Sequence, residues 1–65
     1  MSVTILEAVA QAKREFLQVP GIVGIGYSGN TIIFYVETPE DVAKVPILYL
    51  NYSVVAKVTG RVRLL

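Results

Sequence analysis

The first regular pattern along the chain is helical. Apolar residues recur at intervals of three or four positions, at Ile5, Val9, Ala12 and Phe16, as on the buried stripe of an amphipathic helix. Thr4 and Glu7 have the spacing of a capping box, in which Thr4 is the N-cap and Glu7 reaches back to its amide. Because the residue before Pro20 is biased against the helical conformation, the helix is predicted to end there.

Two segments with the composition of strands follow this helix. Residues 22–27 and 31–37 are rich in β-branched and aromatic side chains, which favour strands. Between them, Gly29-Asn30 is a favoured two-residue hairpin turn. The two segments are therefore predicted to form a β-hairpin.

Residues 38–45 predict a second, shorter helix. Thr38 acts as its cap, Pro39 occupies its first turn, and the two acidic residues that follow meet the positive end of the helix dipole. Val42 and Val45 are expected to face the core before the next proline ends the helix.

The last part of the chain combines an ambiguous segment with a clear one. Residues 47–52 leave two interpretations open, a buried connector or a short edge strand that turns at Asn51. From there onward the side chains alternate in the manner of a strand. One side carries Tyr52, Val54, Ala56, Val58, Val62 and Leu64, and the other carries Ser53, Val55, Lys57, Thr59, Arg61 and Arg63. Gly60 interrupts the run and predicts a bulge or bend.

The predicted fold class is α+β, in one domain of residues 1–65 with the order α-β-β-α-β. Two helices are expected on one face of a small, mainly antiparallel sheet, a ferredoxin-like arrangement without its first strand. That omission leaves either a direct parallel pairing between the hairpin and the last strand or an open slot. The end of the last strand, beyond Gly60, is predicted to pair with another chain and cover an unpaired edge.

Composition adds an argument for self-association. Hydrophobic residues make up 54% of only 65 residues, and a chain this short has a small core for its surface. Without Cys, no disulfide supports the fold. A homo-oligomer, with a protein partner as a further expectation, is the predicted support; a dense core with scattered surface Val and Ile is the alternative.

Charge and hydropathy restrict the partners and the location. The net charge of +1 is too small to predict nucleic-acid or membrane attraction. No apolar run approaches the roughly 18 residues of a membrane span, and no secretory signal is recognisable. We expect a cytoplasmic protein without a membrane partner.

The side chains that usually carry catalysis are scarce. With no His and no Cys, the commonest metal ligands and acid–base groups are missing, and no serine has a histidine to activate it. Glu37, Glu40 and Asp41 cluster where a helix start already explains them. We therefore predict no enzyme, no cofactor and no metal site.

Residues 24–29 match the glycine pattern of dinucleotide-binding loops. That pattern must follow a strand and open a helix, whereas here a strand-like segment follows. The alternative interpretation is that Gly24 and Gly26 allow a neighbouring group to approach the first strand closely, while Gly29 serves the turn.

A candidate interaction surface comes from the alternation of the strands. We predict that the exposed sheet face carries Ile33, Tyr35, Val55 and Lys57, with Arg61 and Arg63 at the end of the last strand. The favoured function is self-association and protein binding through this face or the sheet edge. Weak binding of single-stranded RNA by the same face is the alternative, and edge protection by Lys and Arg is the structural interpretation.

Residues 19–27 (VPGIVGIGY), 32–37 (IIFYVE), 45–46 (VP) and 58–62 (VTGRV) carry a family resemblance. In this order they resemble a small α+β domain found beside some prokaryotic trypsin-like peptidases. The resemblance implies a free-standing accessory module, and the chain has no Ser-His-Asp set that could bring peptidase activity. The hairpin-and-helix pattern is also similar to heavy-metal-associated domains, but their paired cysteines are absent here.

Overall fold

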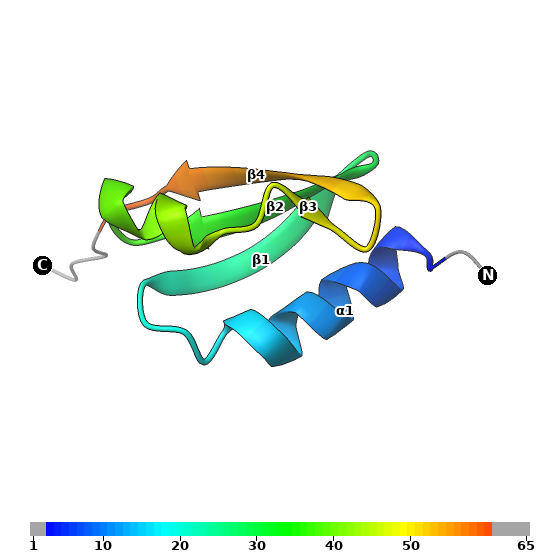
Figure 1. Ribbon diagram of the computed structural model, residues 1–65, viewed down its shortest axis with the longest axis horizontal. Helices are drawn as coiled ribbons and strands as arrows, with labels where there is room; N and C mark the ends of the chain where they lie inside the picture. The colour runs from blue at the N-terminus through cyan, green and yellow to red at the C-terminus, as the bar shows by residue number, and fades with distance from the viewer. Residues whose placement is uncertain (1–2, 61–65) are drawn as a thin grey trace, which may run out of the picture.

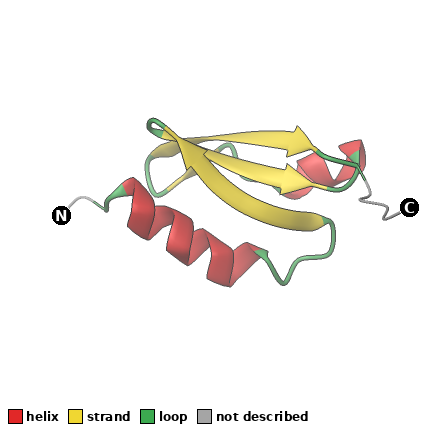
Figure 2. Ribbon diagram, turned by 180° about the vertical axis from the view of Figure 1, so that it is seen from behind, coloured by secondary structure: helices red, strands yellow, loops and turns green. Residues whose placement is uncertain are grey.

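The computed structural model describes residues 3–60 and contains one α-helix and a four-stranded mixed sheet, in the class of small α+β domains (Figure 1). The elements in chain order are α1 (Ile5–Phe16), β1 (Ile22–Ser28), β2 (Thr31–Val36), the 3₁₀ helix η1 (Pro39–Lys44), β3 (Leu48–Tyr49) and β4 (Tyr52–Val58). Helix α1 runs alongside β1 and packs on one face of the sheet, as the view from behind also shows (Figure 2).

The N-terminal cap of α1 confirms the prediction, with one difference. The backbone N–H of Glu7 donates to the Thr4 hydroxyl at 3.2 Å. The Glu7 carboxylate accepts from the Thr4 hydroxyl at 3.3 Å rather than from the Thr4 amide. Two of the three buried residues of the helix are alanines, Ala8 and Ala12, which let the helix axis lie close to the sheet.

The strand order is β1-β2-β4-β3, with antiparallel outer pairs and a parallel central pair. Of the two arrangements left open by the missing first strand, the chain adopts direct parallel pairing, with Thr31–Val36 of β2 aligned to Ser53–Val58 of β4. The sheet is thus mixed, because its centre is parallel. The crossover between these two strands contains η1 and β3.

The ambiguous segment 47–52 contains a short edge strand and not a buried connector. Strand β3 pairs antiparallel with β4 through Leu48–Ser53 and Tyr49–Tyr52. The turn between them places Leu50 and Asn51 at φ 48° and 71°. Both values lie in the left-handed region that a type I′ hairpin turn requires.

The second predicted helix is a 3₁₀ helix of six residues, so the expectation of two helices packed on the sheet is not met. The segment lies between two prolines, Pro39 and Pro46, and this length is too short for a stable α-helix, whereas 3₁₀ turns suit short connectors. Val45 packs against the core as predicted, but the Val42 side chain is 40% exposed.

The core lies between α1 and the first two strands. Ile32, Phe34 and Val36 of β2 are fully buried and point toward the helix, as the alternation predicts. The Phe16 ring of α1 meets the Phe34 ring edge-on, with the ring centroids 5.1 Å apart. Strand β2 is therefore the centre of the packed structure.

Candidate binding surface

Pairing of β2 with β4 brings four of the predicted surface residues together. Ile33 aligns with Val55, and Tyr35 aligns with Lys57, on the sheet face opposite α1. Ile33 and Tyr35 are half-buried, Val55 is 47% exposed, and Lys57 is exposed. We call these four residues the helix-free face. Its role as an interface stays a prediction.

Two predicted residues of this surface, Arg61 and Arg63, lie outside the described residues. The predicted pairing of the chain beyond Gly60 also falls there. In the described part of the chain, the cation that the helix-free face carries is Lys57.

The glycines of the dinucleotide-like motif serve the sheet. Gly24 aligns with Tyr35 and Gly26 with Ile33. A Cβ added at Gly24 or Gly26 would lie 3.6 or 3.7 Å from the Tyr35 ring, so the ring lies over the glycines, and Gly29 is in the turn at φ 59°. The residues after the motif form β2 and not a helix. The motif is therefore part of a β-hairpin, and its third glycine serves the turn.

A second arrangement of polar groups joins η1 to the start of β1. One carboxylate oxygen of Asp41 accepts from the Thr38 N–H at 3.1 Å and from the Thr38 hydroxyl at 2.8 Å. The other oxygen forms a salt bridge of 2.9 Å with the Lys44 ammonium, which also donates to the Pro20 carbonyl at 2.7 Å. Hydrogen bonds from Lys44 and then Thr38 lower the pKa of Asp41.

Both oxygens of the Asp41 carboxylate have partners within the fold, so this carboxylate has a structural role. Gly21 leaves the space for it: its φ is +97°, and a Cβ there would lie 2.3 Å from the Asp41 Cγ. The Gly21 carbonyl accepts from the Glu37 N–H at 2.8 Å. We call Gly21, Thr38, Asp41 and Lys44 the polar anchor. Sequence reasoning found the helix start but not its connection to the loop before β1.

A third polar contact links α1 to the edge strand β3. The Tyr49 hydroxyl donates to the Glu15 carboxylate, and the Tyr49 ring packs edge-on against Phe16 at a centroid distance of 5.7 Å. Burial and the neighbouring Glu15 raise the pKa of Tyr49 to about 12. The Tyr52 hydroxyl similarly donates to the Val3 carbonyl at 2.5 Å. These two contacts join β3 to α1 and the start of β4 to the residues just before α1.

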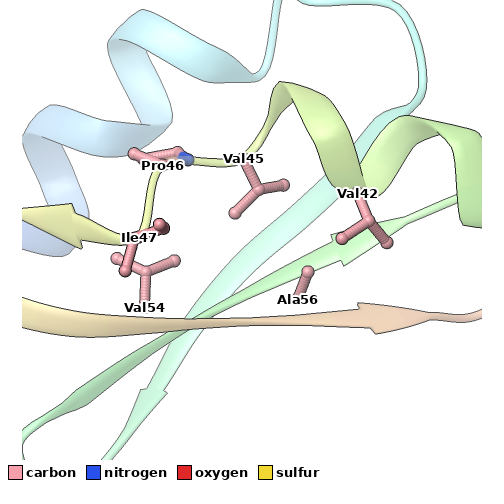
Figure 3. Close-up of a pocket in the computed structure, with 6 residues that line it drawn as sticks. All are labelled: Val42, Val45, Pro46, Ile47, Val54 and Ala56. Atoms are coloured by element: carbon pink, nitrogen blue, oxygen red, sulfur yellow. The ribbon is translucent and has the colours of Figure 1, made fainter.

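An apolar groove of about 170 Å³ lies between η1 and β4 (Figure 3). Its lining residues are Val42, Val45, Pro46, Ile47, Val54 and Ala56. Of these residues Ile47 is 85% exposed, and Leu48, which follows it in the chain, is 63% exposed. Sequence reasoning missed this groove, and the apolar run 45–48 around a proline was the available signal.

Within residues 3–60, no group of three or more carboxylate, imidazole or thiol side chains is placed to hold a metal ion. None of the helices described is long and apolar enough to cross a membrane. No family model matches the chain, and neither a curated protein nor a solved structure shows significant similarity to it.

Proposed function

We propose that this chain is a non-enzymatic, cytoplasmic binding module that self-associates and binds protein through the helix-free face. The observation that supports this most directly is the contiguous placement of Ile33, Val55 and Tyr35 on the side of the sheet away from α1. Sheet faces of this composition are normally buried, by a helix or by a second sheet about 10 Å away.

The shape of this face suits sheet-on-sheet packing of two copies. The Tyr35 ring lies beside Gly24 and Gly26 of β1, which add no side chains to this part of the face. The resulting surface carries an apolar centre with Lys57 at one end. A charge at one end suits the polar rim of an interface, whereas the centre gains from exclusion of water.

The proposal retains two relations suggested by the sequence. One is a ferredoxin-like pattern without its first strand, which the parallel pairing of β2 with β4 supports, because those strands run parallel in the complete pattern. The other is the resemblance to an accessory module found beside peptidases. Neither relation brings catalytic residues with it.

The decisive experiment uses a matched pair of substitutions on β4. Val55 and Val58 are both 47% exposed, but Val55 lies on the helix-free face and Val58 aligns with the buried Val36. Molar mass is measured by size-exclusion chromatography with light scattering over a range of concentrations. Val55→Lys is expected to weaken self-association at least about tenfold, because assembly would bury an unpaired ammonium group, while Val58→Lys keeps the mass of the original chain.

Ionic strength separates this function from RNA binding. Apolar self-association persists or strengthens as salt rises, whereas phosphate binding weakens steeply. A monomer at all concentrations, together with salt-sensitive binding of a polyuridylate oligonucleotide, would replace the proposal by the nucleic-acid alternative. Equal behaviour of the Val55 and Val58 variants would show that the helix-free face is not the contact.

A further inference from the structure

The outer edge of β1 is a long, uncharged strand edge. β1 is the last strand on its side of the sheet, and its sequence IVGIGYS contains neither a charged residue nor a proline. Val23 and Tyr27 within it are 55% and 47% exposed. Natural sheet edges that stay unpaired usually carry lysines, prolines or β-bulges or are very short, as the two-residue β3 is at the other edge. β1 has an irregularity in its pairing between Ile22 and Gly24, but residues 24–28 pair regularly with β2 and carry no lysine or proline.

One flank of α1 lies toward this edge and is apolar apart from Lys13. Glu15 accepts the Tyr49 hydroxyl from β3, so its flank of the helix faces the β3 end of the sheet. The opposite flank therefore faces the β1 end. It carries Leu6, Ala10, Lys13 and Leu17 at spacings of four, three and four residues. Leu6 and Leu17 are 61% and 43% exposed.

This flank is complementary to a second copy of itself. Its spacing reads the same in both directions, so an antiparallel copy places Leu6 opposite the partner copy's Leu17. The charges along α1 are also distributed unevenly along its length, with Glu7 in the first turn and Lys13 and Arg14 in the last. Antiparallel alignment brings the acid of each copy beside the bases of the other.

Pairing of the β1 edges and contact between the α1 flanks are both compatible with the same two-fold symmetry. Two β1 edges that pair antiparallel across a two-fold axis place both α1 helices on one face of the joined sheet, antiparallel to each other. A standard interface removes about 800 Å² from each partner. That is about one sixth of the 4743 Å² surface of this chain.

We infer that a second copy of this chain pairs along β1, with the α1 flanks in contact across the two-fold axis. The inference rests on the proposed self-association and adds a contact separate from the helix-free face. Edge pairing and face packing together join more than two copies, whereas each contact alone gives a dimer.

The test is carried out on the Val55→Lys variant, in which the face contact is removed, so that only the contact along the β1 edge is measured. Leu6→Lys is added to one sample and Leu48→Lys to another. Leu6 and Leu48 are 61% and 63% exposed, but Leu48 lies on the opposite sheet edge. Light scattering gives the masses, and hydrogen exchange of residues 22–28 is followed as concentration rises. Far-UV circular dichroism confirms that each variant is folded.

The expected result is a Val55→Lys dimer that Leu6→Lys converts to a monomer and Leu48→Lys leaves intact, with amide protection in β1 increasing with concentration. A Val55→Lys variant that is monomeric at all concentrations overturns the edge contact while supporting the helix-free face. A dimer that survives Leu6→Lys, or that both added lysines dissociate, also overturns it. If Val55→Lys leaves the mass unchanged, the face contact fails and the Leu6 and Leu48 pair still decides the edge.

Discussion

The face of the sheet that carries α1 has two ends, one formed by β1 and β2 and the other by β4 and β3. Elements of different kinds cover these two ends. Over β1 and β2 lies α1, a 12-residue helix whose alanines allow close packing, and the residues below it are buried. At the other end, η1 packs against β4 and against part of β2, and there the half-buried Val54 and Ala56 line the groove. The first end is held by burial of apolar surface.

The second end is held mainly by directed polar contacts. The polar anchor joins η1 to the start of β1, and Tyr49 joins the edge strand to α1. A six-residue 3₁₀ helix has too little apolar surface to bury the sheet, so hydrogen bonds with defined partners fix its position. One small sheet face is thus covered by apolar packing at one end and held by hydrogen bonds and a salt bridge at the other.

The largest expected effect tests burial directly. Phe34→Ala removes a fully buried ring at the α1 end and is expected to lower the free energy of unfolding by about 3–5 kcal/mol. Val54→Ala at the groove end should lower it by about 1 kcal/mol, because that side chain is only partly removed from water. Urea unfolding followed by circular dichroism measures both. Equal losses would contradict the difference between the two ends.

A glycine substitution tests how tightly the anchor joins the ends. Gly21→Ala forces a side chain into the space of the Asp41 carboxylate at a positive φ, and about 2–3 kcal/mol of stability should be lost. Gly29→Ala is the control, because its φ is also positive but no atom lies within 4 Å of the added Cβ. It should cost about 1 kcal/mol. If both cost the same, the anchor contributes nothing beyond backbone conformation.

The contact between Tyr49 and Glu15 has an alkaline signature. Burial first, and then Glu15, raise the pKa of Tyr49 from 10.0 to about 12. The stability that depends on a neutral Tyr49 is therefore full below pH 10 and is lost as the pH rises from 10 toward 12. Tyr49→Phe should cost about 1 kcal/mol at neutral pH and make unfolding less dependent on pH in that window. Absorbance of tyrosinate should show one late-titrating group that this substitution removes. A variant that keeps the late group would refute the assignment.

The smallest expected effect concerns acid. The pKa of Asp41 is lowered from 3.8 in the folded chain, so below 3.8 the unfolded state binds more protons and stability falls as the pH falls through the folded value. Asp41→Asn keeps the shape of the side chain but cannot titrate. The difference between urea midpoints at pH 7 and pH 3 should be smaller for Asp41→Asn than for the original chain. An unchanged difference would remove Asp41 from the acid response.

Local patterns were enough for the first half of the fold. The periodicity ending at Phe16, the cap at Thr4 and the Gly29-Asn30 turn each involve residues close in sequence, and α1, β1 and β2 follow them. The alternation of β2 and β4 also places Ile33 and Val55 on the side away from α1. The members of the helix-free face were predictable for that reason.

The anchor and the groove were not predictable in this way. Lys44 meets Pro20 across 24 positions, and Tyr49 meets Glu15 across 34. No periodic pattern records such a contact, since it depends on where two separate segments arrive. The groove likewise exists only because η1 stays a short 3₁₀ helix above β4.

The sequence by itself therefore determined the amphipathic helix, the hairpin and the sidedness of the strands, because backbone preference and side-chain alternation act over a few residues. Tertiary structure decided the parallel pairing of β2 with β4, the 3₁₀ form of Pro39–Lys44 and the positions of both edges. These features depend on how much surface each whole segment buries and on which hydrogen bonds it forms. Both are fixed only when distant parts of the chain meet.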